Sequence, residues 1–148
     1  MSSDLNTAIV QRFFDEVCNG RNQSAADELF APNHQYHDPS SPWVGSGPEG
    51  MKQLTSLYYT AFADAHWNVD EMIAGNDGTV VTRWTARGTQ TAELQGLPAT
   101  GRQVTVQGIW INRVSGDRIQ ESWNVWDTLG MLQQLGVVPS MGASAART

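Results

Sequence analysis

The segment Arg118-Ile-Gln-Glu-Ser-Trp-Asn-Val-Trp-Asp127 runs directly into Thr128-Leu-Gly-Met-Leu-Gln-Gln-Leu-Gly136. Alternation in the first part predicts a strand, and the second part predicts a short apolar helix over residues 128–135. One strand face would carry Gln120, Ser122, Asn124 and Trp126, and the other Ile119, Glu121, Trp123, Val125 and Asp127. Polar groups that alternate with tryptophans are typical of a cavity wall that holds a flat, partly polar molecule.

Further strands are predicted before this one. Residues 66–74 and 79–91 flank Gly75-Asn-Asp-Gly78, a strong hairpin signal, and residues 103–114 lead into the turn Ser115-Gly-Asp117. In the strand of residues 103–114, the face that includes Trp110 would also carry Val104, Val106, Gly108 and Asn112.

The first part of the chain predicts helices. Apolar residues recur at helical spacing over residues 4–19, a second short helix opens at Ser24, and a third carries an apolar stripe from Met51 to Phe62. Residues 33–39 are predicted to be a strand or an extended rim. Helices followed by antiparallel strands predict an α+β fold, a cone of curved antiparallel sheet wrapped around N-terminal helices. We predict one domain over residues 1–138 and a disordered tail over 139–148.

Composition disfavours several classes of partner. The chain carries nine Lys and Arg against fifteen Asp and Glu, a net charge of −6, so we expect neither nucleic acid nor a membrane as partner. The single cysteine, Cys18, excludes an intrachain disulfide and a cysteine-built metal site, and it is predicted to be a buried, inert thiol. We find no signal-peptide pattern and no apolar run of membrane-span length, and therefore expect a cytoplasmic protein.

His37 is the candidate general base, because the carboxylate of Asp38 is adjacent and histidine exchanges protons near neutral pH. The alternative is a surface or hydrogen-bonded structural histidine. A zinc site of His34 and His37 is not expected, because the two would lie on opposite faces of a strand with no third ligand nearby. We therefore predict no metal.

Asp127 stands where the last strand becomes a helix, and would either cap that helix or take part in catalysis. Asn124 could polarise a carbonyl or position a water, or be a satisfied polar residue of the sheet. The chain has six tryptophans, and those predicted to shape the pocket are Trp43, Trp84, Trp110 and Trp126. No nucleotide, flavin, haem or phosphate-loop motif is found, so we expect no cofactor.

Several motifs resemble those of the SnoaL-like polyketide cyclases (ester cyclases), within the nuclear transport factor 2-like superfamily, over about residues 5–136. They are Ala8-Ile-Val-Gln-Arg-Phe-Phe14, Tyr36-His-Asp-Pro39, Gly47-Pro-Glu-Gly50, Arg83-Trp-Thr-Ala-Arg-Gly-Thr89, Gly96-Leu-Pro-Ala-Thr-Gly101 and the stretch from Glu121 to Gly136. The resemblance implies a cone with an internal pocket, a homodimer formed through sheet faces, and a pocket-facing segment around Tyr36 and His37.

In the characterised cyclases of this family, an aspartate on the last strand is the acid/base of an intramolecular aldol closure, and a histidine on the preceding strand assists it. Counted from Leu132-Gln-Gln-Leu-Gly136, these positions are Asn124 and Trp110 in this chain. Both departures remove a titratable group, so the aldol mechanism does not carry over. Proton chemistry is instead expected at His37, together with Asp38 or Asp127.

The leading hypothesis is a cofactor-independent enzyme that binds a hydrophobic carbonyl or polyketide-like molecule and transfers protons in a cyclisation, isomerisation or hydration. One alternative is an epoxide hydrolase or hydroxylase with an Asp-Arg-Asp arrangement, to which Arg83 and Asp127 could contribute. Another is a non-catalytic module for small-molecule binding or dimerisation.

Overall fold

The structure, a computed structural model, describes residues 3–140, so most of the predicted tail, residues 141–148, lies outside the described part of the chain. In chain order the elements are α1 (Ser3–Arg12), the π-helix η1 (Phe13–Asn19), α2 (Ser24–Leu29), β1 (Phe30–His37), α3 (Gly47–Ala61), β2 (His66–Ala74), β3 (Thr79–Thr89), β4 (Gln103–Ser115), β5 (Arg118–Trp126) and α4 (Thr128–Gln134). None of the helices within residues 3–140 combines the length and the apolar character needed to cross a membrane.

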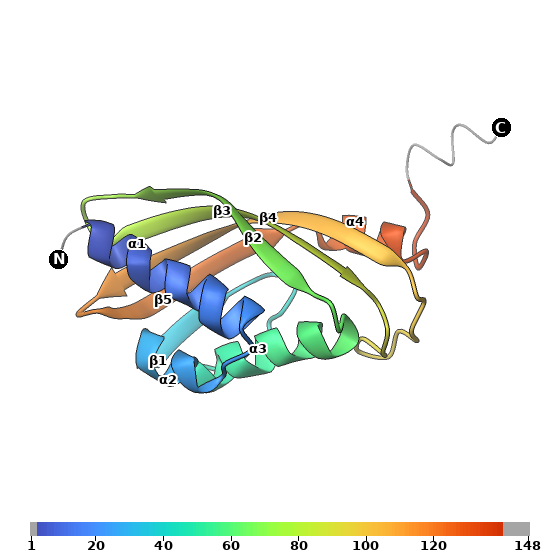
Figure 1. Cartoon of the computed structure of the whole chain (residues 1–148), viewed down its shortest axis with the longest axis horizontal. Helices are drawn as coiled ribbons and strands as arrows, with labels where there is room; N and C mark the ends of the chain where they lie inside the picture. The colour runs from blue at the N-terminus through green and yellow to red at the C-terminus, as the bar shows by residue number, and fades with distance from the viewer. Residues whose placement is uncertain (1–2, 141–148) are drawn as a thin grey trace.

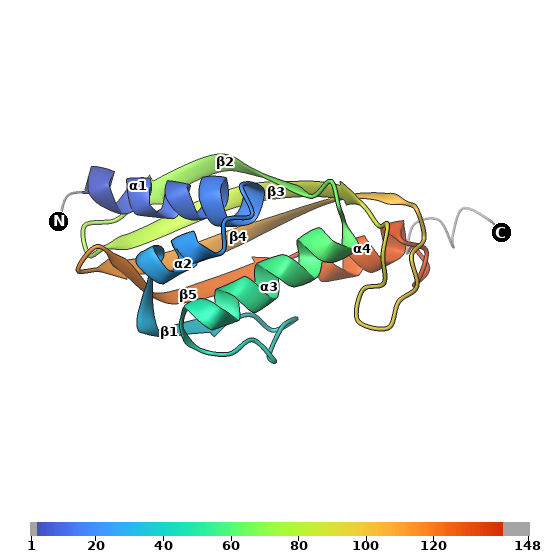
Figure 2. The same ribbon diagram turned by 60° about the horizontal axis from the view of Figure 1, so that its bottom comes forward.

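Five strands form one sheet in the order β1-β5-β4-β3-β2. The pairs from β2 to β5 are antiparallel, whereas β1 pairs with β5 in parallel. The sheet curves, and α1, α2 and α3 lie along one side of it (Figures 1 and 2). This arrangement confirms the predicted α+β fold with a curved sheet against N-terminal helices, but the sheet is not wholly antiparallel as predicted, because β1 joins its edge in parallel.

The predicted helix of residues 4–19 is present, but it changes winding at Phe13, where η1 begins. The η1 segment buries Phe13, Phe14, Val17 and Cys18 against the sheet. Burial of Cys18 also raises the pKa of its thiol well above the ordinary value, as expected for an inert thiol. The predicted extended segment is β1, whose inward residues include His34 and whose outward residues include His37.

The face assignment for β4 is confirmed, since Val104, Val106, Gly108, Trp110 and Asn112 are all buried. The assignment for β5 is correct from Ser122 onward but wrong at the start of the strand. The register against β4 shifts between the pairs Arg113–Glu121 and Val114–Ile119, which leaves Gln120 as an extra residue. This bulge turns Ile119 into the core, where it is fully buried, and Gln120 instead donates to the carbonyl of Ser115.

Candidate functional site

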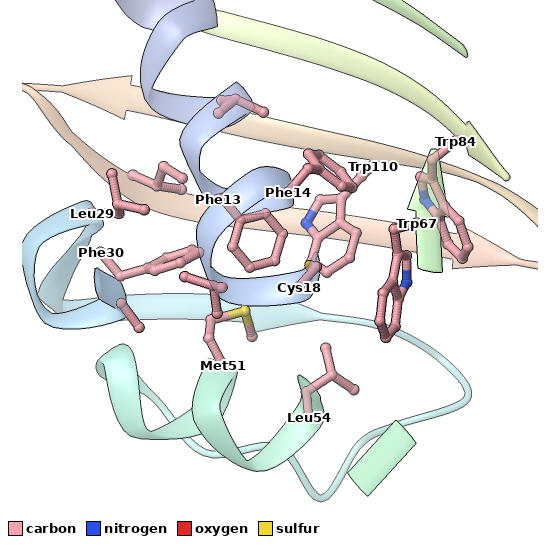
Figure 3. Close-up of a cluster of buried hydrophobic side chains, with 14 of the residues drawn as sticks. Phe13, Phe14, Cys18, Leu29, Phe30, Met51, Leu54, Trp67, Trp84 and Trp110 are labelled. Carbon is pink, nitrogen blue, oxygen red and sulfur yellow. The ribbon is translucent and has the colours of Figure 1, made fainter. Parts of the chain in front are cut away.

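A narrow cavity, open to solvent at its mouth, lies between α3 and the inner face of the sheet. Its tryptophan walls come from β2, β3, β4 and β5: they are Trp67, Trp84, Trp110 and Trp126. Figure 3 shows three of these indoles on the same side of the core as Leu54 and Cys18, which also line the cavity.

Gly108 allows two of these walls to approach each other. It pairs with Trp84 on one side and with Trp126 on the other. A Cβ at position 108 would lie 2.5 Å from Cζ2 of Trp84 and 2.7 Å from Cβ of Trp126. Both distances are shorter than non-bonded carbon atoms tolerate. Trp84 and Trp126 can therefore pack over β4 at this position only because Gly108 has no side chain.

Asn124 supplies the amide group of the cavity wall and is 3% exposed. Its Oδ1 accepts a hydrogen bond from Nε1 of Trp84 at 3.3 Å, and its Nδ2 donates to the hydroxyl of Tyr36 at 3.0 Å. The Tyr36 hydroxyl in turn donates to Oδ2 of Asp38 at 2.7 Å. A continuous chain of hydrogen bonds therefore leads from the cavity to a carboxylate.

Asp38 is buried, at 7% exposure, immediately after β1. Its Oδ1 accepts hydrogen bonds from the backbone nitrogen and the hydroxyl of Ser40, at 2.9 and 2.6 Å. Burial, with the Asp38 charge as a second cause, raises the pKa of Tyr36 above its ordinary value. Burial likewise raises the pKa of Tyr58, on the cavity wall, to about 12. Both phenols are therefore neutral hydrogen-bonding groups at physiological pH.

His37 lies on the opposite side of the sheet from the cavity. Its Nε2 is 2.6 Å from Oε2 of Glu121, and its ring stacks on Trp123 with 5.4 Å between centroids. The side chain is 44% exposed, and it is not part of the cavity wall. Neither Tyr36 nor His37 is among the described residues that line the cavity, contrary to the expectation for this segment: Tyr36 contacts the lining residue Asn124 from behind it, whereas His37 points outward. The reason is the alternation of β1, which points neighbouring residues to opposite faces.

Asp127 and Trp43 are also outside the cavity lining. Asp127 is the N-cap of α4, and its Oδ1 accepts from the backbone nitrogen of Gly130 at 2.8 Å. This confirms the capping role that the sequence left open. Trp43 is exposed in the loop after β1, so it does not shape the pocket as predicted.

A second buried polar group lies deeper under the helices. His34 is fully buried and its Nε2 lies 2.8 Å from the hydroxyl of Ser122, which donates to Oδ1 of Asn112. Because the Ser122 hydrogen is used on Asn112, His34 must donate from Nε2. Burial lowers the pKa of His34 to about 4, which keeps it neutral. Within residues 3–140, no three His, Cys, Asp or Glu side chains are grouped to hold a metal ion.

The chain was compared with models of known protein families. The family model for SnoaL-like polyketide cyclases matches residues 8–135. The chain belongs to the SnoaL-like polyketide cyclase family. Comparison with curated protein sequences finds no match.

Several solved structures share the fold over most of the chain. TsrD from Streptomyces laurentii is 25% identical, with a TM-score of 0.82, and the match covers 93% of this chain and 99% of TsrD. A candidate polyketide cyclase of Acidithiobacillus ferrooxidans is 31% identical, with a TM-score of 0.80 and the same coverage of 93% and 99%. IdmH, a candidate polyketide cyclase of Streptomyces antibioticus, is 28% identical, with a TM-score of 0.75 and coverage of 88% and 98%.

The two positions at which the SnoaL-like resemblance expects acid/base residues are neighbours in the cavity. Trp110 and Asn124 are directly paired across β4 and β5, and both line the cavity wall. Among the described lining residues, Arg87 alone is charged. Arg83, considered for an Asp-Arg-Asp arrangement, is on the outer face, 3.6 Å from both Asp70 and Glu71. That arrangement is not assembled in the cavity.

Sequence reasoning missed three contributors to the SnoaL-like site, Trp67, Tyr58 and Gly108, and it considered Asp38 only beside His37, not as the buried end of the hydrogen-bond chain. A signal was available for Asp38. The pattern Asp38-Pro-Ser40 is a local turn in which Asp38 accepts the Ser40 backbone N–H, and such a turn holds a carboxylate in one orientation. For Trp67 and Tyr58, their place in the cavity depends on long-range packing.

Proposed function

We propose that this SnoaL-like protein is a cofactor-independent enzyme that binds a flat, hydrophobic carbonyl compound of polyketide type and moves a proton on it, in a cyclisation, isomerisation or hydration. The observation that carries the proposal is the Asn124 amide, buried in an indole-lined cavity and joined through Tyr36 to the carboxylate of Asp38. Indole faces favour planar aromatic ligands. The amide gives the cavity a polar contact for the carbonyl oxygen.

The proposed reaction step is an enolisation. As a proton leaves the carbon next to the carbonyl, negative charge develops on the oxygen, and an N–H of Asn124 stabilises it. An amide cannot take up a proton at neutral pH. Tyr36 is not among the described residues that line the cavity, so the substrate must reach past Asn124 for its proton to be received by the Tyr36 oxygen. At the same time the Tyr36 hydroxyl proton moves to Asp38, which leaves an enolate and a neutral carboxyl group. The reverse transfer returns a proton to the product.

A binding module without catalysis is the second candidate. It is favoured by the composition of the cavity wall, whose described residues include neither a carboxylate nor an imidazole. In this reading the Tyr36–Asp38 pair only orients Asn124.

Exchange of the α-protons of 2-tetralone in D2O, followed by proton NMR, separates the two candidates. The ketone is planar over its aromatic ring, and exchange reports enolisation without knowledge of the natural product. We expect the protein to accelerate exchange, and Asn124→Leu to reduce the acceleration roughly 10²-fold or more. Binding of the ketone without acceleration supports the binding module. If the ketone neither binds nor exchanges, both candidates fail.

The homodimer and the cytoplasmic location also belong to this proposal. Apolar side chains on the outer sheet face support a dimer, because Ile109 and Val125 are exposed beside Trp123. Sedimentation of the wild type and of Val125→Glu tests it. A dimer that the substitution dissociates is expected, and a monomeric wild type would exclude this interface.

A further inference from the structure

The hydrogen-bond chain from Trp84 to Asp38 has a fixed direction. An indole N–H can only donate, so Trp84 must face an acceptor, and that acceptor is Oδ1 of Asn124. A carboxylate only accepts, and Asp38 receives the Tyr36 hydroxyl on one oxygen and two hydrogen bonds from Ser40 on the other. Both ends therefore impose the same order: Trp84 to Asn124 to Tyr36 to Asp38.

This order decides which group Asn124 presents to the cavity. The oxygen of its amide is turned to Trp84, and one of its two N–H groups is used on Tyr36. The other N–H has no hydrogen-bond partner among residues 3–140, on a side chain that lines the cavity. A ligand carbonyl can accept from this N–H. A ligand hydroxyl that accepts from this N–H has its own proton directed away from the Asn124 oxygen, which faces Trp84, so it gains no second hydrogen bond from Asn124 and is disfavoured.

We propose that Asp38, acting through the Tyr36 hydroxyl, is a positioning residue that makes the cavity selective for ligands that present a carbonyl rather than a hydroxyl to Asn124. The proposal rests on the proposed function in one respect, namely that the ligand occupies this cavity. It names the substrate group and the residue that selects it.

The variant Asp38→Asn tests the direction of the chain. Its amide keeps both Ser40 hydrogen bonds only by using its oxygen for them, which turns an NH2 donor toward Tyr36. Tyr36 must then donate to Asn124, and Asn124 must turn its oxygen away from Trp84. Two donors, from Trp84 and from Asn124, would then face each other, so the free N–H loses its fixed position.

The experiment compares 9-fluorenone, 9-fluorenol and fluorene, which share one planar skeleton and differ in the polar group. Binding is followed by quenching of tryptophan fluorescence. We expect the wild type to bind fluorenone roughly tenfold more tightly than fluorenol or fluorene. Asp38→Asn should reduce this ratio to within about twofold. The matched control is Asp77→Asn in the β2–β3 turn, where the carboxylate accepts from Thr79, and it should keep the wild-type ratio.

A rescue distinguishes positioning from a general structural effect. Tyr36→Phe removes the hydroxyl that transmits the change, while Trp84 still orients Asn124. The double variant Asp38→Asn, Tyr36→Phe should therefore regain the preference for fluorenone, although it carries two substitutions. If Asp38→Asn does not fold, Asn124→Asp replaces the free N–H by an oxygen, and should invert the preference toward fluorenol.

The outcomes separate the two proposals. If none of the three probes binds, the cavity is not the ligand site and the proposed function fails. If all three bind equally to the wild type, the proposed binding stands and the selectivity is overturned. A fluorenone preference that survives Asp38→Asn, or that the double variant does not regain, overturns the role of Asp38.

Discussion

The ring of Phe13 meets the indole of Trp110 edge-on, with 5.0 Å between centroids, and this contact marks where the packed core ends and the cavity begins. On one side of Trp110, Phe13 also packs on Phe14 and Phe30, at 5.1 and 5.2 Å, and fills the interior. On the other side, Trp110 joins Trp84 at 6.4 Å along the cavity wall. Figure 3 shows Phe13 and Phe30 on one side of Trp110 and Trp84 on the other, the side on which the cavity lies.

Gly108→Ala is expected to disturb the hollow end. The added methyl group would lie 2.5 Å from the Trp84 ring, so the indole must shift. We expect a loss of about 1–3 kcal/mol in the free energy of unfolding, measured in urea, and weaker fluorenone binding. Gly45→Ala is the matched control, because its Cβ would meet only the side-chain oxygen of Gln53, at 3.9 Å. Equal effects of the two substitutions would contradict the close packing at Gly108.

The stability of the protein should depend on pH through His34. The pKa of His34 is about 4 in the folded state, against 6.5 for an unperturbed histidine side chain, because burial disfavours the charged ring. The unfolded chain therefore binds the proton first as the pH falls, and stability drops between about pH 6.5 and about pH 4. The contribution present above about pH 6.5 is on the order of 3 kcal/mol and is lost below about pH 4.

Urea unfolding of the wild type and of His34→Gln, at a series of pH values, measures this contribution. Glutamine can still donate to Ser122 but does not titrate, so the variant should show a shallower loss of stability between about pH 6.5 and about pH 4.5. Other titrating groups are common to both proteins and cancel in the comparison. Parallel curves would mean that His34 is protonated as easily in the folded state as in the unfolded chain.

His37→Ala is expected to leave catalysis unchanged, because His37 lies outside the cavity and contacts Glu121 and Trp123. Loss of this half-exposed contact with Glu121 should change the free energy of unfolding by less than about 1 kcal/mol. The measurement is α-proton exchange of 2-tetralone beside urea unfolding. A fall in exchange of roughly 10²-fold without a fall in stability would return His37 to the mechanism.

Asp127→Ala should act on the stability of α4 rather than on the chemistry. The carboxylate accepts from Gly130 at the first turn of this helix, and loss of an N-cap costs about 1 kcal/mol. Asp127→Asn retains an acceptor oxygen and should be close to the wild type in urea unfolding. If Asp127→Asn lowers ketone exchange as strongly as Asn124→Leu, a capping role alone is insufficient.

The order of elements and the inner face of β4 could be predicted from sequence because both depend on short-range patterns. Alternation set Trp110 and Asn112 on one face, and the turn at Gly75–Gly78 separated β2 from β3. The inward positions of Asn124 and Trp126 followed from the same alternation. The bulge at Gln120 could not be predicted, because it depends on how two strands of unequal length pair.

The candidate site was only half predictable. Residue type alone favours His37 over Asp38 as the group that exchanges a proton. In the structure, the strand directs His37 outward, and the turn after the strand buries Asp38. Trp67 reaches the cavity from the far edge of the sheet, and Tyr58 from α3. Neither position carries a local signal that distinguishes a cavity wall from a packed core.

By itself, the sequence determined that this chain forms an α+β fold with tryptophan and amide groups on an inner strand face. Those features follow from periodicity and from turn residues, which act over a few positions. Only the tertiary structure decided which carboxylate connects to Asn124, on which side of the sheet each histidine lies, and where the interior stays open. These depend on the parallel pairing of β1 with β5 and on side chains that meet from distant segments, and such contacts are set by packing of the whole molecule.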